Sequence, residues 1–241
     1  FALCATTTGF KNIAVGYIAL RKNTTGCYNT GFGTGAIYCN TAGCNNVAVG
    51  GDALYNTNGS SNTAVGTTSL YLNTTGGQNT ASGYLALRNN TTGSANTATG
   101  TCALFANTTA VGNTAVGMKA LCANTTGTAN TGLGYDSLRF NTTGCHNTAV
   151  GSYSSLYTNG CGNTTAGYRV LQTNSTGSFN TAIGLTALYL NTTASYNTAV
   201  GGCALYANTI GEKNVAHGFD SLKVNTTGSY STALGAQALR A

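Results

Sequence analysis

Glycine recurs along the whole chain at a nearly constant spacing, and this constrains the fold more than any other feature. Fourteen glycines stand 17 residues apart, except for two steps of 16. They are Gly16, Gly33, Gly50, Gly66, Gly83, Gly100, Gly117, Gly134, Gly151, Gly167, Gly184, Gly201, Gly218 and Gly235. A fixed period this short is typical of stacked repeats, in which each unit buries its apolar face against its neighbours. We therefore expect one elongated repeat domain over residues 1–241.

The repeat unit reads N-T-A-V-G-x-x-A-L-x-x-N-T-T-G-x-x, and its composition favours β-structure. Two helices with turns would need nearly twice this length, and Thr, Asn and Gly are poor residues for a helix interior. Alternation along N-T-A-V-G sends Thr and Val to one face and Asn, Ala and Gly to the other. The Leu or Ile four places after the glycine is expected to point inward. The N-T-T-G segment is expected to turn the chain, with its glycine at positive φ.

These features predict an all-β fold, a single parallel β-solenoid of about fourteen 17-residue coils. Successive coils would pair about 4.8 Å apart. A helical turn within G-x-x-A-L-x-x-N is the alternative for that part of the unit. In the short coil that follows Gly151, Leu156 stands one place late, which predicts a local bulge.

Charged residues are scarce, at 6% of the chain, and the net charge is +6. The basic residues are scattered, so we expect no nucleic-acid partner, and no apolar run reaches the roughly 20 residues that span a membrane. Asp52, Asp136 and Asp220 share one column but lie five coils apart, about 24 Å by the coil spacing. Catalytic carboxylate pairs work within roughly 10 Å. With no His or carboxylate at metal-ligand spacing either, we expect neither an enzyme nor a cofactor.

Two pairs of cysteines occupy equivalent places in neighbouring coils. Cys27 matches Cys44, and Cys145 matches Cys161. Equivalent residues about 5 Å apart fall within the Cα separation of a disulfide, so we predict the bridges Cys27–Cys44 and Cys145–Cys161. The alternative is that cysteine fills places meant for a small residue. Disulfides would locate the protein outside the reducing cytosol.

Asparagine stands seven places after most of the glycines and begins N-x-[ST] sequons there. These candidate glycosylation sites are Asn23, Asn73, Asn90, Asn107, Asn124, Asn141, Asn174, Asn191 and Asn225. In a secreted protein such sequons accept covalent glycans. The alternative is a ladder of asparagine hydrogen bonds that closes the turn, because the column keeps Asn40 and Asn208, where no sequon exists.

A column of aromatic and cationic residues stands five places after the glycines. It includes Tyr38, Tyr55, Tyr71, Arg88, Tyr189 and Tyr206. Because the preceding Leu points inward, these side chains should face outward. They could contact another chain or a carbohydrate by stacking and cation–π interactions. The alternative is that they stack on one another along the solenoid.

The N-T-A-V-G-x-x-A-L units, as at residues 113–121 and 197–205, resemble the repeats of bacterial and phage surface fibres. They are similar to the head repeats of trimeric autotransporter adhesins, where S-V-A-I-G units form a left-handed parallel β-roll. The resemblance implies a left-handed solenoid and an extracellular fibre or adhesin, at the cell or virion surface.

Neither end of the sequence shows a polar, atypical capping repeat. Open coils expose unpaired strand edges, so such solenoids could stack end to end by contacts that do not close. Our main hypothesis is a structural subunit of an extracellular fibre that assembles head to tail with itself and carries glycans. The alternative is an adhesin or phage tail-fibre shaft that binds host carbohydrate. A third hypothesis is ice binding through regular Thr arrays, although the most regular Thr pair lies at the turn.

Overall fold

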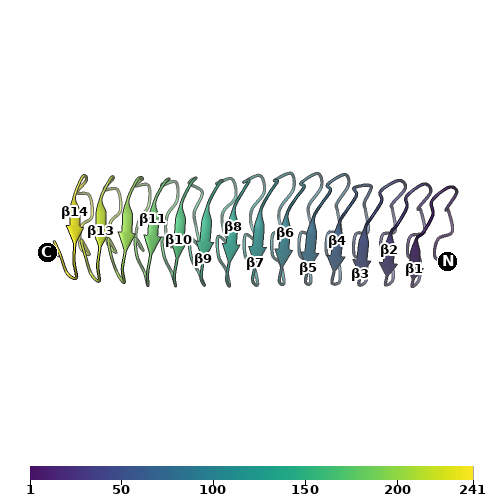
Figure 1. The fold of residues 1–241 in the computed structure, drawn as a ribbon, viewed down its shortest axis with the longest axis horizontal. Helices are drawn as coiled ribbons and strands as arrows, with labels where there is room; N and C mark the ends of the chain where they lie inside the picture. Colours follow the sequence, from purple (N-terminus) through teal and green to yellow (C-terminus); the bar gives the residue numbers. More distant parts are fainter. Residues whose placement is uncertain (241) are drawn as a thin grey trace. The chain divides into compact units, whose positions relative to one another are not determined.

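The computed structural model describes residues 1–240, in which the chain forms fourteen short parallel strands and no helix. It divides into two compact units, Phe1–Thr126 and Gly127–Ala241. In each unit the chain winds into a parallel β-solenoid, and consecutive strands lie side by side in one sheet (Figure 1). The predicted all-β solenoid with coils of about 17 residues is confirmed. The handedness and the single domain stay predictions.

Every strand is three residues long and occupies the T-A-V part of the repeat. The first unit contains β1 (Ile13–Val15), β2 (Thr30–Phe32), β3 (Val47–Val49), β4 (Thr63–Val65), β5 (Thr80–Ser82), β6 (Thr97–Thr99) and β7 (Thr114–Val116). The second contains β8 (Thr131–Leu133), β9 (Thr148–Val150), β10 (Thr164–Ala166), β11 (Thr181–Ile183), β12 (Thr198–Val200), β13 (Val215–His217) and β14 (Thr232–Leu234). Equivalent residues pair, as Ala81 does with Ala98 and Ala182 with Ala199.

The interior of each coil is narrow and holds small and medium apolar side chains. The middle residue of the strand and the Leu four places after the glycine are fully buried, as Ala81 and Leu87 are in the first unit and Ala199 and Leu205 in the second. Burial of each Leu contributes about 1.5–3 kcal/mol. Of the two faces that the alternation predicts, the one with Asn and Ala therefore points inward, and the one with Thr and Val points outward.

The segment between the strand and the buried Leu makes consecutive turns in place of the alternative helical turn. In these turns the Leu itself adopts a left-handed conformation, with φ of 50° at Leu87 and 49° at Leu104. This conformation costs an L-residue roughly 1–2 kcal/mol. The burial of the Leu side chain is large enough to offset that cost, which explains why a bulky residue is kept there.

Glycine recurs at two places in the repeat unit, for a different structural reason at each place. The glycines that follow the strands have positive φ, as Gly83 and Gly100 do at 135° and 127°. The prediction of positive φ for the N-T-T-G glycine is wrong. A Cβ added to Gly93 would instead lie against the carbonyl of Ala110 and Oδ1 of Asn90. At this second place glycine therefore provides room for close packing between coils, and Ala110 shows that a methyl group can be accommodated.

The two short coils lose one residue from the N-T-T-G turn, which becomes T-N-G at 57–59 and 158–160. In a full coil, the carbonyl of Thr91 accepts hydrogen bonds from the amides of Thr74 and Thr75 at 2.9 and 3.2 Å. In the first short coil, Oδ1 of Asn58 accepts the equivalent bonds from the amides of Thr41 and Ala42 at 2.8 and 3.4 Å. A side-chain carbonyl thus replaces a main-chain carbonyl.

The second short coil uses the same replacement. Oδ1 of Asn159 accepts hydrogen bonds from the amides of Thr142 and Thr143 at 2.7 and 3.4 Å. The sheet is not interrupted, because β9 and β10 pair residue for residue. Ser155 takes the place of the buried Leu, and its hydroxyl lies 3.0 Å from that of Thr165. The predicted bulge is therefore absent from the strands. The late position of Leu156 instead reflects the polar Ser155 at the core place that Leu occupies in other coils.

Substitution of the two kinds of glycine should separate their roles. We expect Gly100→Ala to lower the free energy of unfolding by about 2 kcal/mol or more, because φ at Gly100 is 127° and the added Cβ would lie 2.7 Å from the Gly117 carbonyl. Gly93→Ala, the matched comparison, also brings a Cβ against a carbonyl of the next coil, that of Ala110, but Gly93 does not have positive φ and alanine occupies the equivalent place at Ala110 and Ala194. We therefore expect a smaller loss, about 1 kcal/mol. Urea unfolding of both variants measures the difference, and equal losses would contradict this account.

Candidate functional site

Two columns of asparagine run through the interior of each unit. The strand-entry asparagines directly precede the strands, and the turn asparagines begin the N-T-T-G segments. The strand-entry Asn79 donates to the carbonyl of Gly93 at 2.8 Å, and its main-chain amide donates to Oδ1 of Asn62 at 3.0 Å. The turn residue Asn90 donates to the same Gly93 carbonyl at 2.9 Å and to Oδ1 of Asn73 at 2.7 Å. Each turn carbonyl of this kind therefore joins both ladders.

The second unit repeats this arrangement. The carbonyl of Ala194 accepts from Nδ2 of Asn180 at 2.9 Å and from Nδ2 of Asn191 at 3.0 Å. Asn191 also donates to Oδ1 of Asn174 at 2.8 Å. Both donors and the acceptor are shielded from water. Each bond therefore satisfies a buried polar group that would otherwise have no hydrogen-bond partner.

The candidate glycosylation sites are these turn asparagines. Eight of the nine are fully buried, namely Asn23, Asn73, Asn90, Asn107, Asn124, Asn141, Asn174 and Asn191. Asn225 is half-buried and donates to Oδ1 of Asn208 at 2.9 Å. The Nδ2 atom that would carry a glycan is a ladder donor. The folded structure therefore favours the hydrogen-bond ladder over glycan attachment at this column.

The predicted cysteine pairs lie together but form no bridge. None of the nine cysteines is joined to another by a disulfide in this structure. The sulfur of Cys44 accepts a hydrogen bond from the amide of Cys27 at 3.1 Å, and Cys161 does the same for the amide of Cys145 at 3.1 Å. Serine makes the equivalent bond in other coils, as Ser94 does with the amide of Gly77 at 3.1 Å. Cysteine thus occupies a place that the small residue serine fills in other coils, as the alternative expects, and the two disulfides stay predictions.

The aromatic column stacks on itself within each unit. The ring centroids of Tyr38 and Tyr55 lie 4.8 Å apart and those of Tyr55 and Tyr71 lie 5.1 Å apart. The guanidinium of Arg88 lies 5.5 Å from the Tyr71 centroid. In the second unit Tyr189 and Tyr206 stack at 5.2 Å. The ring faces are thus covered by neighbouring coils, and the edges are left to solvent.

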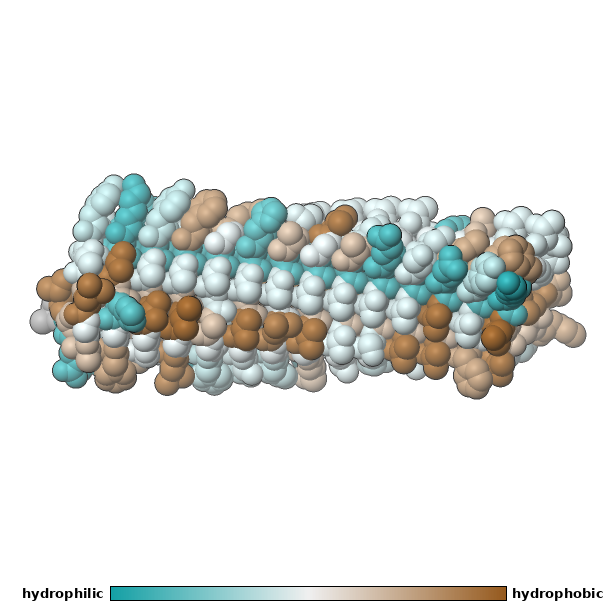
Figure 2. Space-filling view, viewed as in Figure 1, coloured by the Kyte–Doolittle hydropathy of each residue, from teal (hydrophilic) through white to brown (hydrophobic). Residues whose placement is uncertain are grey.

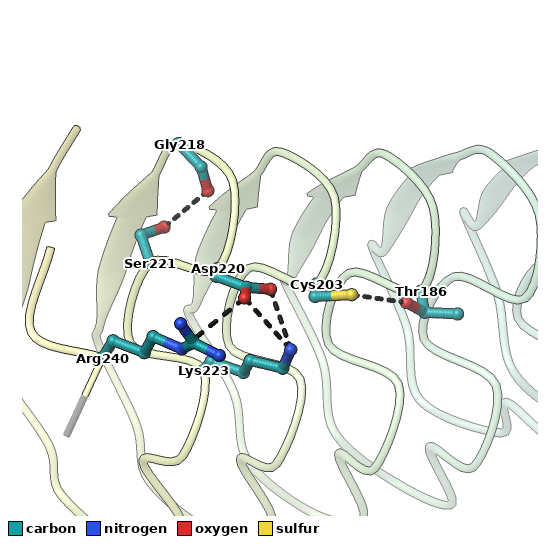
Figure 3. A network of polar contacts seen from close by, with 7 residues as sticks. All are labelled: Thr186, Cys203, Gly218, Asp220, Ser221, Lys223 and Arg240. Atoms are coloured by element: carbon teal, nitrogen blue, oxygen red, sulfur yellow. Dashed lines mark hydrogen bonds and ion pairs between the residues drawn. The ribbon is translucent and has the colours of Figure 1, made fainter. Parts of the chain in front are cut away.

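The aspartates of the single column are engaged separately. Asp136 pairs with Arg139 at 3.1 Å. Asp220 pairs with Lys223 at 3.0 Å and with Arg240 at 3.6 Å, and its side chain is only 4% exposed (Figure 3). In the same region the sulfur of Cys203 lies 3.3 Å from the Thr186 hydroxyl. The carboxylates of Asp136 and Asp220 are thus each balanced by a cation of the same unit.

Among residues 1–240, no cluster of three or more His, Cys, Asp or Glu side chains is arranged to hold a metal ion. That part of the chain also has no helix long and apolar enough to cross a membrane. A surface hollow of about 340 Å³ lies beside the first short coil, where the turn has lost a residue. It is lined by Cys39, Asn56, Thr57, Asn58, Leu72, Thr74 and Thr91. These residues supply one thiol and no acid–base pair.

A regular outward surface accompanies the strands in each unit. We call it the strand face: the first and third residues of each strand and the residue after the following glycine. Its large apolar members in the first unit are Ile13, Val15, Tyr17, Phe32, Val47, Val49, Val65, Tyr84, Val116 and Met118. Figure 2 shows these rows, in which brown apolar side chains run beside a pale row of small polar ones. Sequence alternation predicts two faces but not that Thr and Val would be the exposed one.

No protein-family model matches the sequence, and a search of curated proteins finds no similar one. The function is therefore inferred from the geometry of the chain itself.

Removal of one turn asparagine should destabilise the solenoid. Asn90→Ala deletes bonds to Asn73, Gly93 and Asn107 and leaves buried groups unpaired, which should cost about 2–4 kcal/mol. The neighbouring Asn89→Ala is the matched control, since Asn89 is not fully buried and should cost less than about 0.5 kcal/mol. Chemical unfolding measures both. Similar values for the two variants would show that the ladder contributes little.

The Cys145 thiol should react slowly at neutral pH. A hydrogen bond with the Cys161 thiol, and then burial, raises the pKa of Cys145 from its ordinary value of 9.0 to about 11. Its contribution to stability is therefore complete below about pH 9 and is lost as the pH rises towards 11. Alkylation by iodoacetamide, followed by peptide mass spectrometry from pH 8 to 11, should show Cys145 lagging behind the exposed Cys4. Equal rates at pH 8 would contradict the shift.

Proposed function

We propose that the chain is a structural subunit of an extracellular fibre. The observation that carries this proposal is the asparagine ladder, because each coil presents the same donors and acceptors to the next. Asn73, Asn90 and Asn107 continue one line of bonds at 2.7 and 2.8 Å. Such a repeat is extended by adding coils, and its interior has no need of a ligand or cofactor.

The placement of reactive groups supports a mechanical role over catalysis. The buried aspartates are held in ion pairs within their own coils or with the adjacent coil. The thiols that lie together are used as hydrogen-bond partners of main-chain amides. Acid–base or nucleophilic chemistry needs groups that converge on one substrate position, and the repeat distributes its polar groups along columns instead.

The adhesin alternative relies on the aromatic column. Carbohydrates are usually recognised by open ring faces, but Tyr55 has Tyr38 on one face and Tyr71 on the other. Burial in this stack, followed by the nearby Cys39, raises the pKa of Tyr55. The stack therefore suits coil-to-coil stabilisation better than a sugar platform, and carbohydrate binding ranks below the fibre.

One observation favours ice binding as a further candidate. Threonine faces outward on the strands, at Thr63, Thr80, Thr97 and Thr114 among others, and not only at the turn. The adjoining row varies from Ser82 to Phe32. A flat crystal lattice would meet an uneven surface there, so we rank ice binding below the fibre as well.

Negative-stain electron microscopy of the purified chain tests the proposal. We expect filaments that become more abundant with protein concentration, since a fibre subunit must self-associate. Circular dichroism of the same sample controls for folding. Folded protein that shows only separate monomers or closed trimers at the highest concentration would contradict the proposal.

A further inference from the structure

We infer that the strand face is a docking surface for a second copy of this chain, which would pack against it side by side. The inference rests on the proposed fibre function and deepens it by naming the contact surface. Three features of the face carry it: the absence of charge, the amount of exposed apolar surface, and the repeat of its side chains.

The strand face carries none of the chain's ten Lys and Arg or four acidic residues. In both units these charges lie on other columns, such as Arg88 and Arg139 on the aromatic column. The second unit has His217 on this face. Depletion of charge is typical of the core of protein interfaces. It also means that two copies with net charge +6 can approach through this face without bringing like charges together.

The exposed apolar surface is large enough for a stable interface. In the first unit alone, Tyr17, Phe32 and Tyr84 are 68%, 56% and 54% exposed, and Val65 and Val116 are 41% and 40% exposed. With roughly 200 Å² for an aromatic side chain and about 100 Å² for an aliphatic one, the large apolar members expose on the order of 600 Å². A standard interface buries about 800 Å² per partner, of which roughly 500 Å² is apolar.

The repeat of the face points to a second copy as the occupant. Its side chains recur once per coil, so ridges and hollows follow at a pitch of about 4.8 Å. Only a partner with the same pitch can stay in register over many coils. In the column after the glycines, the bulky Tyr17 and Tyr84 are separated by the small Thr34, Gly51 and Thr67, which leaves a hollow that suits interdigitation and not contact with a flat lattice.

A charged double substitution on the face tests the inference. Val65→Asp with Val116→Asp places two carboxylates where the apolar contact would form, and both side chains are exposed enough that the fold should be kept. Sedimentation velocity over a concentration series should show self-association weakened at least tenfold. The matched control, Thr75→Asp with Thr92→Asp, adds the same charge at exposed turn places outside the face and should associate like the unsubstituted chain.

A mixing experiment makes the result specific to like-to-like docking. The Val65→Lys, Val116→Lys variant alone should associate as poorly as the Asp variant, and an equimolar mixture of the two should recover association. Filaments that persist unchanged in the Asp variant would overturn the inference and leave the fibre function standing, whereas absence of all self-association in the unsubstituted chain would overturn both. Thermal hysteresis without self-association, lost in the Asp variant, would assign the face to ice and also overturn the inference.

Discussion

Hydrogen bonding between buried asparagines of successive coils is the interaction on which the rest of the structure depends. A coil of about 17 residues encloses too little space for a large apolar core, and its turns bring main-chain carbonyls inward. Buried carbonyls need partners. The Asn side chain carries a donor and an acceptor at once, so identical residues can link the coils above and below while also bonding to the turn, as Asn90 does.

This requirement also determines what the outside of the molecule looks like. Because Asn and Ala must point inward, strand alternation leaves Thr and the larger apolar residue outside. The outer face of a three-residue strand therefore carries an exposed apolar side chain beside the Thr in most coils, and nothing in the described fold covers it. The inner asparagine ladder lies beside buried Ala and Leu, while large apolar side chains are exposed outside, and these exposed rows are the surface on which the proposed self-association depends.

The short coils show how strongly the turn bonding is maintained. When one residue of N-T-T-G is missing, Asn58 and Asn159 place a side-chain carbonyl where the lost main-chain carbonyl would lie. The sequence shows that one residue is missing. That the Asn side chain takes over the lost main-chain carbonyl follows only from the positions of the amides in the neighbouring coil. The same limit applies to the cysteines. Periodicity correctly predicts that Cys27 lies beside Cys44, while the choice between a disulfide and a bond to the Cys27 amide depends on side-chain geometry.

The sequence alone determined the period, the parallel pairing of equivalent residues, the inward Leu and the columns along which cysteine, asparagine and aromatic residues recur. These follow from spacing, because a repeat of constant length places equivalent residues next to one another. The tertiary structure alone decided which strand face is buried, that the sequon asparagines are interior, that Leu87 rather than the N-T-T-G glycine has positive φ, and that the aromatic rings cover one another. Each of these features depends on the closed shape of the coil. Packing and hydrogen bonding between neighbouring coils decide which side chains point inward, and the spacing of residues does not encode that direction.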